Sequence, residues 1–146
     1  MIKHLHSGWA YIVLLVLILA FVNALIGAIK DKDFKDKDLR LSLFALIAAH
    51  IQLILGFIMY YVSPFYEHMR EIGMGASMKD PTTRLFVVEH PLMMILAIVF
   101  ITIGFSKHKK KKTNLAKFKT VAVFYGIALL LVLSKIPWHA WFSTAS

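Results

Sequence analysis

Cysteine is absent from the sequence. Its absence excludes disulfide bonds, iron–sulfur clusters held by thiolates and haem attached covalently through thioether links. The sequence also lacks a Walker-type phosphate loop, a glycine fingerprint for dinucleotides and a nucleophile elbow. These absences argue against a nucleotide-dependent enzyme or a serine hydrolase. Any metal site has to use ligands other than thiolates.

Charged residues are scarce over four long stretches of the chain. Hydrophobic residues make up 59% of the 146 residues and the mean hydropathy is +0.69, which is too apolar for a soluble domain of this length. A helix needs about 20 apolar residues to cross a bilayer, and four runs approach that length: residues 8–29, 41–62, 85–104 and 120–138. The first run is too long for the core of a typical signal peptide, and no small-residue cleavage site follows it. We therefore expect one transmembrane domain over residues 1–146.

Basic residues are concentrated in two of the connections. Residues 30–40 and 107–119 contain 12 of the 17 lysines and arginines, and the positive-inside rule places such segments in the cytoplasm, with both termini outside. Short connections favour an antiparallel four-helix bundle whose first and third helices are diagonal. The predicted fold is therefore an all-α, integral-membrane antiparallel four-helix bundle. We interpret the basic segments as solvated topology signals that also attract anionic lipids, and expect no nucleic-acid partner.

The third apolar run carries Glu89, His90 and Pro91 side by side. Ionisable residues are costly in a hydrophobic span and indicate a function. Pro91 frees a backbone carbonyl one turn earlier, which predicts a kink at this polar position. Asp80 and Pro81 are typical of a helix cap and first helical residue, so the third helix is expected to start ahead of its apolar part.

Four histidines lie in the runs or at their edges. Counting from the first basic residue at each cytoplasmic end, at about 1.5 Å per residue, gives heights of ~15 Å for His50, ~25 Å for His90, ~30 Å for His139 and ~36 Å for His6. Three of them cluster toward the outer leaflet. His6 and His90 nevertheless differ in height by roughly two turns, so the pair can meet only if the first helix tilts or extends outward.

The outer-leaflet histidines suit a haem site. Without cysteine a haem is b-type, and bis-histidine ligation needs two neutral imidazoles on opposite sides of one iron. His6 and His90 come from diagonal helices and are the predicted ligands. His50 with His90 is the competing pair.

Three charged residues lie at the same height as these histidines. Arg84 and Lys135 are predicted to pair with the haem propionates. Glu89 is predicted to orient a histidine by accepting its hydrogen bond.

The other polar residues have simpler interpretations. Asn23, deep in the first run, is expected to bond a neighbouring helix. The remaining histidines are assigned to the membrane interface (His4 and His139) or to solvent (His68 and His108). A short interfacial helix is expected over residues 64–72.

Five segments carry a family resemblance: LHSGW (residues 5–9), AHIQLILG (49–56), VEHPLMM (88–94), FYGIALL (124–130) and IPW (136–138). Together they resemble small four-span membrane proteins of Bacteroidetes-type bacteria that are commonly labelled cytochrome B. The similarity covers nearly the whole chain, and it implies a haem-binding bundle.

A second resemblance is to one four-helix half of haem A synthases. In that family a histidine opens the first helix of the half, another lies in the third, and a Gln…Leu-Gly pattern lies between them. The resemblance implies ligand roles for His6 and His90, with Gln52 to Gly56 matching the pattern. An acidic residue that the family carries shortly before its first histidine is missing here. The resemblance therefore implies a haem-holding bundle and not haem A synthesis.

Three hypotheses follow. The first is a b-type haem protein that passes electrons between the quinone pool and a partner, and is an electron carrier more than an enzyme with its own substrate. The second is a haem-free subunit that stabilises a larger respiratory or other membrane complex, or an oligomer. The third is a small transporter that uses His50, Asn23 and Gln52. A visible spectrum separates the first from the others.

Overall fold

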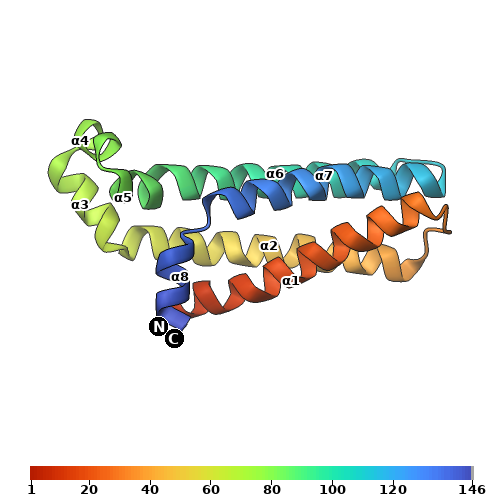
Figure 1. The fold of residues 1–146 in the computed structure, drawn as a ribbon, viewed down its shortest axis with the longest axis horizontal. Coiled ribbons are helices and arrows are strands. Elements are labelled where there is room, and N and C mark those ends of the chain that lie inside the picture. The colour runs from red at the N-terminus through yellow and green to blue at the C-terminus, as the bar shows by residue number, and fades with distance from the viewer. Residues whose placement is uncertain (146) are drawn as a thin grey trace.

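The computed structural model describes residues 1–145, which form four long helices joined by shorter segments (Figure 1). The long helices are α1 (Ile2–Ile29), α2 (Asp36–Val62), α6 (His90–Lys109) and α7 (Asn114–Lys135). Helix α6 continues from α5 (Pro81–Arg84) through the π-helical turn η1 (Leu85–Glu89), so the third span covers residues 81–109. All four spans are long and apolar enough to cross a membrane. The predicted all-α, multi-pass architecture is confirmed at this level.

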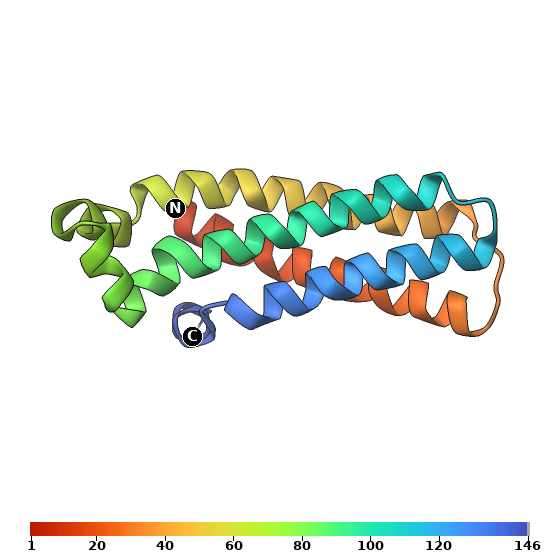
Figure 2. The ribbon, with the colours of Figure 1, turned by 90° about the horizontal axis from the view of Figure 1, so that it is seen from above.

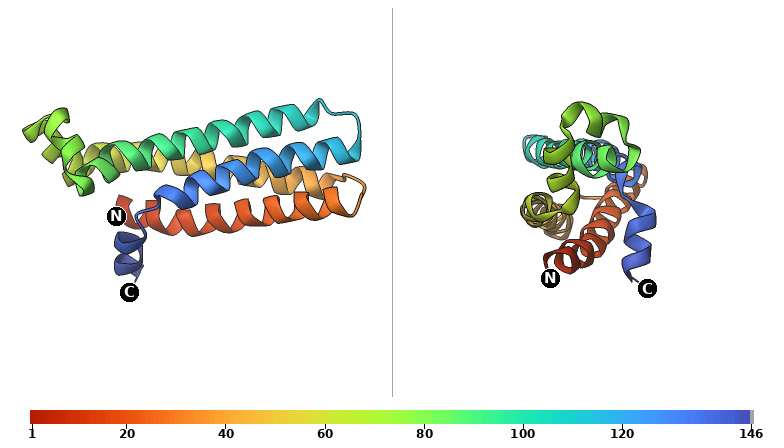
Figure 3. Two further views of the ribbon diagram at one scale, coloured as in Figure 1. Left: turned by 45° about the horizontal axis from the view of Figure 1, so that its top comes forward. Right: turned by 90° about the vertical axis from the view of Figure 1, so that its left-hand side faces the viewer.

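The spans run antiparallel around a common core. Helix α1 packs along α2 and α7, and α6 packs along the same two helices from the opposite corner. The views in Figure 3 show this four-cornered arrangement. The predicted diagonal placement of the first and third spans is therefore correct.

The two ends of the bundle differ in construction (Figure 2). The loop end carries two short connections, at residues 30–35 and 110–113. The terminal end carries the start of α1, the helix α8 (Trp138–Ala145), and a longer connection through α3 (Pro64–Ile72) and α4 (Met74–Lys79). The predicted helix at residues 64–72 is confirmed, and α4 was not expected.

Several helix ends lie outside the predicted runs, because caps and not hydropathy set them. Helix α2 starts at Asp36, where the Asp38 carboxylate accepts the backbone N–H of Lys35 at 2.8 Å. Helix α7 starts after Thr113, whose hydroxyl accepts a backbone N–H of its first turn. The fourth span ends at Lys135 and not at residue 138, since Pro137 cannot continue the helical hydrogen bonds.

Close packing of small residues characterises the half of the bundle nearer the loop end, which we call the closed half. A Cβ added at Gly27 would meet the Phe118 ring, and one added at Gly104 would meet Phe124. Small residues let helices approach closely in a membrane, where lipid supplies no hydrophobic drive for their association. Buried alanines extend this contact along the bundle: Ala20, Ala24, Ala45, Ala48, Ala49, Ala97, Ala122 and Ala128.

Two polar links reinforce the closed half. The Asn23 amide donates to Asp38 at 2.8 Å, and the buried Tyr125 hydroxyl donates to the Ser42 carbonyl at 2.7 Å. The predicted helix-bridging role of Asn23 is confirmed. Residues 30–40 are not uniformly solvated as predicted, because Asp38 is 4% exposed and satisfies donors from two segments.

The prediction that His108 is solvated is wrong. Its side chain faces inward from the last turn of α6 and is 1% exposed. The ring packs against Phe34 at 5.4 Å and Phe105 at 4.8 Å between centroids. The burial of His108 could not be predicted from its position among lysines, because the charge of neighbouring residues does not show which face of the helix a single residue occupies.

Candidate functional site

A cavity of about 420 Å³ occupies the half of the bundle nearer the terminal end, which we call the cavity half. Its walls come from α1, α2, the η1–α6 junction, the end of α7 and α8. Most of its lining is apolar. The polar side chains on the wall include His6, Gln52, Tyr60 and His90.

His6 and His90 meet across the bundle diagonal. Their ring centroids are 6.2 Å apart and the ring planes are nearly perpendicular, at 86°. The predicted height difference of two turns is wrong. Helix α1 is inclined to the other spans (Figure 1). Counting 1.5 Å per residue along a tilted helix overestimates the height of His6 above the cytoplasmic end.

His90 is fixed by the backbone of α7. Its Nδ1 lies 2.8 Å from the carbonyl oxygen of Lys135, at the end of that helix. A carbonyl can only accept, so Nδ1 carries the proton and Nε2 keeps its lone pair. This is the arrangement that orients a histidine toward a metal.

His6 is held from α2. The Gln52 amide donates to the His6 carbonyl at 2.8 Å, while a Cβ added at Gly56 would lie 3.4 Å from His6 Cε1. Two buried atoms here have no hydrogen-bond partner, His6 Nδ1 and Gln52 Oε1.

Pro91 is accommodated without an orphaned carbonyl. The backbone oxygen one turn before it belongs to Val87, and the Tyr60 hydroxyl donates to this oxygen at 3.1 Å. The π-helical turn η1 absorbs the missing bond, since the His90 N–H reaches back to the Leu85 carbonyl. Such turns occur often at functional positions. The predicted irregularity at Pro91 is thus a π-turn with a neighbouring tyrosine as its donor.

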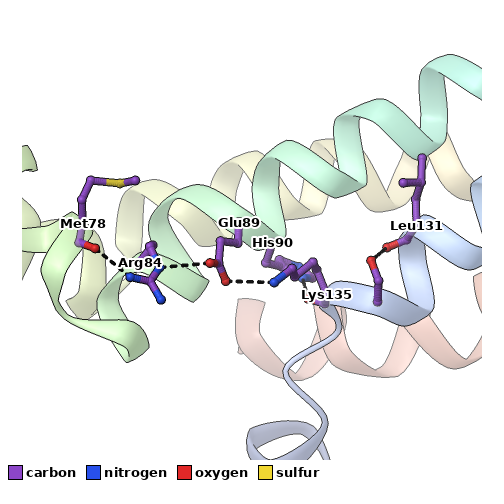
Figure 4. Close-up of polar contacts among 7 residues, drawn as sticks. Met78, Arg84, Glu89, His90, Leu131 and Lys135 are labelled. Atoms are coloured by element: carbon purple, nitrogen blue, oxygen red, sulfur yellow. Dashed lines mark hydrogen bonds and ion pairs between the residues drawn. The ribbon is translucent and has the colours of Figure 1, made fainter.

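Glu89 joins two cations beside His90 (Figure 4). Arg84 Nε lies 3.0 Å from one carboxylate oxygen and Lys135 Nζ lies 3.3 Å from the other. Arg84 also donates to the Met78 carbonyl at 2.8 Å. Glu89 therefore does not accept from a histidine as predicted. Instead it fixes the side chain of Lys135, whose carbonyl holds His90.

His50 lies apart from this cluster. Its side chain is exposed on the outer face of α2, and Nδ1 is 2.8 Å from the Leu46 carbonyl of the same helix. It lines a separate hollow with Thr102 and neighbouring apolar residues. The structure brings His6 and His90 together and leaves His50 outside.

Sequence reasoning did not give Gln52 or Tyr60 a place beside the ligands. Gln52 is the one amide in the second span, four residues before Gly56, and that spacing puts both on one face of a helix. This signal was available. The role of Tyr60 depends on a contact with another helix and could not be read from sequence.

Among residues 1–145, no group of three or more His, Cys, Asp and Glu side chains is arranged to hold a metal ion. The chain matches no family model, no curated protein and no solved structure. The resemblances drawn from sequence segments therefore stay predictions.

Proposed function

We propose that this protein is a b-type haem protein of the bacterial inner membrane, with His6 and His90 as the two axial ligands. The carrying observation is the meeting of these two imidazoles inside a cavity. A haem iron takes four ligands from its macrocycle, so two histidines on diagonal helices complete its coordination. The family resemblances described above point the same way.

The spacing of the rings supports this proposal. Metal–nitrogen bonds to histidine are about 2.0–2.1 Å long, so two imidazoles on opposite sides of one metal have centroids about 6 Å apart. The observed separation is 6.2 Å. The hydrogen bond from His90 to the Lys135 carbonyl supports ligation through Nε2.

The cavity supports the proposal by its size and character. A volume of about 420 Å³ lies within the range of cofactor sites, roughly 300–1,000 Å³, and the mostly apolar wall suits a macrocycle. Arg84 and Lys135 stay predicted partners of the propionates, although both pair with Glu89 and neither lines the cavity. Lys3, at the cavity wall, is a further cation within the same region.

The bound group would supply one-electron chemistry, and the protein would act as a carrier between the quinone pool and a partner. Of the chain's own residues, Lys135 would fix the tautomer of His90 through its backbone carbonyl, and the mostly apolar wall would surround the macrocycle. With the lysine-rich loop end in the cytoplasm, the site lies toward the outer leaflet and both termini are outside.

Visible spectroscopy of the purified protein tests the proposal. We expect a Soret band that sharpens on reduction with dithionite, as in six-coordinate b-type haem. His90→Ala and His6→Ala should each abolish the low-spin spectrum. His50→Ala is the matched control, because it removes an imidazole from a span without touching the cavity, and should keep the spectrum.

Two results would contradict the proposal. A low-spin spectrum retained in both His90→Ala and His6→Ala would reject these ligands. A colourless preparation that co-purifies with other subunits, even after expression with added haem, would favour a haem-free structural subunit.

A further inference from the structure

The cavity extends well beyond the two histidines. On α1 its lining runs from Lys3 to Leu17, and on the third span it continues from His90 to Ile101. Leu17 and Ile101 each lie eleven positions along their helices from the histidine, which corresponds to about 16 Å. That is farther than the edge of a tetrapyrrole lies from its metal. A haem at His6 and His90 leaves this part of the cavity unfilled.

We call this inner part the deep arm. Its wall is formed by apolar residues: Val13, Leu14 and Leu17 of α1, Ala49 of α2, and Ile98 and Ile101 of α6. Leu17 and Ile101, each 1% exposed and part of the buried core, close the inner end of the arm. Interiors are close-packed, and wall atoms beside an empty space lose their dispersion contacts. The deep arm therefore favours an apolar occupant.

The cavity also reaches the lateral surface of the bundle. Phe57 of α2 and Ile95 of α6 both line it, and they are 48% and 37% exposed. Both lie within membrane-spanning helices, so the opening between α2 and α6 faces lipid. At the terminal end, α8 lies across the start of α1, where Trp141 donates to the Ser7 carbonyl at 3.2 Å. Access from the bilayer suits a lipid-soluble molecule.

We propose that the deep arm binds the long apolar tail of a lipid-soluble molecule of the quinone class, which enters between α2 and α6. The tail points toward the loop end, and the polar head lies toward His6 and Gln52. A single-chain membrane lipid shares this chemistry of polar head and apolar tail. The choice of a quinone head rests on the proposed electron transfer, whereas the tail site follows from the cavity alone.

Binding of a decyl-tailed benzoquinone to the purified protein in nanodiscs tests the site. Trp141 lines the cavity, so saturable quenching of tryptophan fluorescence reports occupancy. The same quinone without its tail, and a decyl-chain lysophospholipid, are measured beside it. Nanodiscs without protein correct for partitioning into lipid. We expect the tailed quinone to bind at least about tenfold more tightly than either comparison compound.

A pair of identical substitutions on α1 locates the tail. Val13→Phe fills the deep arm, because Val13 lines the cavity and is 9% exposed. Val22→Phe is the control, since Val22 is 41% exposed on the outer surface of the same helix. We expect Val13→Phe to weaken binding of the tailed quinone about tenfold and to leave the tail-less quinone unchanged. Val22→Phe should bind like the parent.

The haem spectrum of each variant separates this proposal from the proposed function. If the parent protein contains no haem but still binds the tailed quinone, the haem proposal is overturned and the tail-site proposal is supported. Equal binding of tailed and tail-less quinones, or unchanged binding by a folded Val13→Phe protein, overturns the tail site. Tighter binding of the lysophospholipid than of the quinone overturns the quinone assignment.

Discussion

The closed half and the cavity half are built from the same four helices, yet they pack in opposite ways. In the closed half, glycine and alanine bring the helices together, and Tyr125 bridges α7 to Ser42 of α2. In the cavity half, α1 and α6 present imidazoles to each other, and an open volume of about 420 Å³ remains.

The difference indicates that the two halves have different roles: one holds the helices together and the other contains the cavity. Apolar contact with lipid is nearly as favourable as contact between helices, so association depends on close packing and on polar links. The closed half concentrates the close packing, whereas inter-helix hydrogen bonds occur in both halves. The closed half can therefore hold the four helices together while the cavity half keeps space that its own side chains do not fill.

The largest expected contrast comes from one substitution made in each half. Gly104→Ala places a methyl group against Phe124 at a close helix contact, and overpacking of this kind costs about 1–3 kcal/mol. Gly8→Ala, in the cavity half, has nothing within 4 Å of the added Cβ and should stabilise the helix by about 0.5–1 kcal/mol. Unfolding in detergent followed by circular dichroism measures both. Equal effects would remove the distinction between the halves.

Two half-buried amides sharpen the comparison. Gln52→Leu removes the side chain that holds His6, and loss of such a partner lowers affinity for a ligated cofactor about 10–100-fold. Gln52→Glu should weaken affinity as well, because a carboxylate cannot donate to the His6 carbonyl. Asn23→Leu, which loses a bond to Asp38 in the closed half, should reduce stability and leave the potential unchanged. Haem titration measures the affinity and potentiometry measures the reduction potential. A shifted potential in Asn23→Leu would contradict the separation of the haem site from the closed half.

Two tyrosines give a smaller contrast. Tyr125→Phe removes the buried hydrogen bond that joins α7 to the Ser42 carbonyl of α2, which should cost about 1–2 kcal/mol in the free energy of unfolding. Tyr60→Phe frees the Val87 carbonyl beside the cavity, where water can replace the lost donor, so about 0.5–1 kcal/mol is expected. Chemical unfolding of both variants tests this order. The reverse order would mean that the cavity half carries the stability.

The smallest effect concerns pH at the exposed start of α5. The hydrogen bond from Thr83 lowers the pKa of Asp80 from its ordinary value. A carboxylate with a depressed pKa stabilises the folded form above its unfolded pKa of about 3.9, and this contribution is lost as pH falls through the folded value. Amide exchange of α5, corrected for intrinsic rates, should show more opening below about pH 4. Asp80→Asn should remove that step, and the closed half should not show it.

The four spans, their antiparallel order and the diagonal placement of α1 and α6 were all predictable from apolar runs and short connections. So was the inter-helix bond of Asn23. The burial of His108 was not, because it depends on which face of α6 meets Phe34. The partners of Glu89 and His90 also depended on where α7 ends.

The sequence by itself determined that the chain forms four helices long and apolar enough to cross a membrane, because hydropathy and length are properties of each segment alone. It also placed His6 and His90 on diagonal helices. Only the tertiary structure decided that their rings meet at 6.2 Å, that Gln52 bonds the His6 backbone and the Lys135 carbonyl bonds the His90 ring, and that a cavity remains beside them. These features depend on the tilt and rotation of each helix, which packing between distant segments sets.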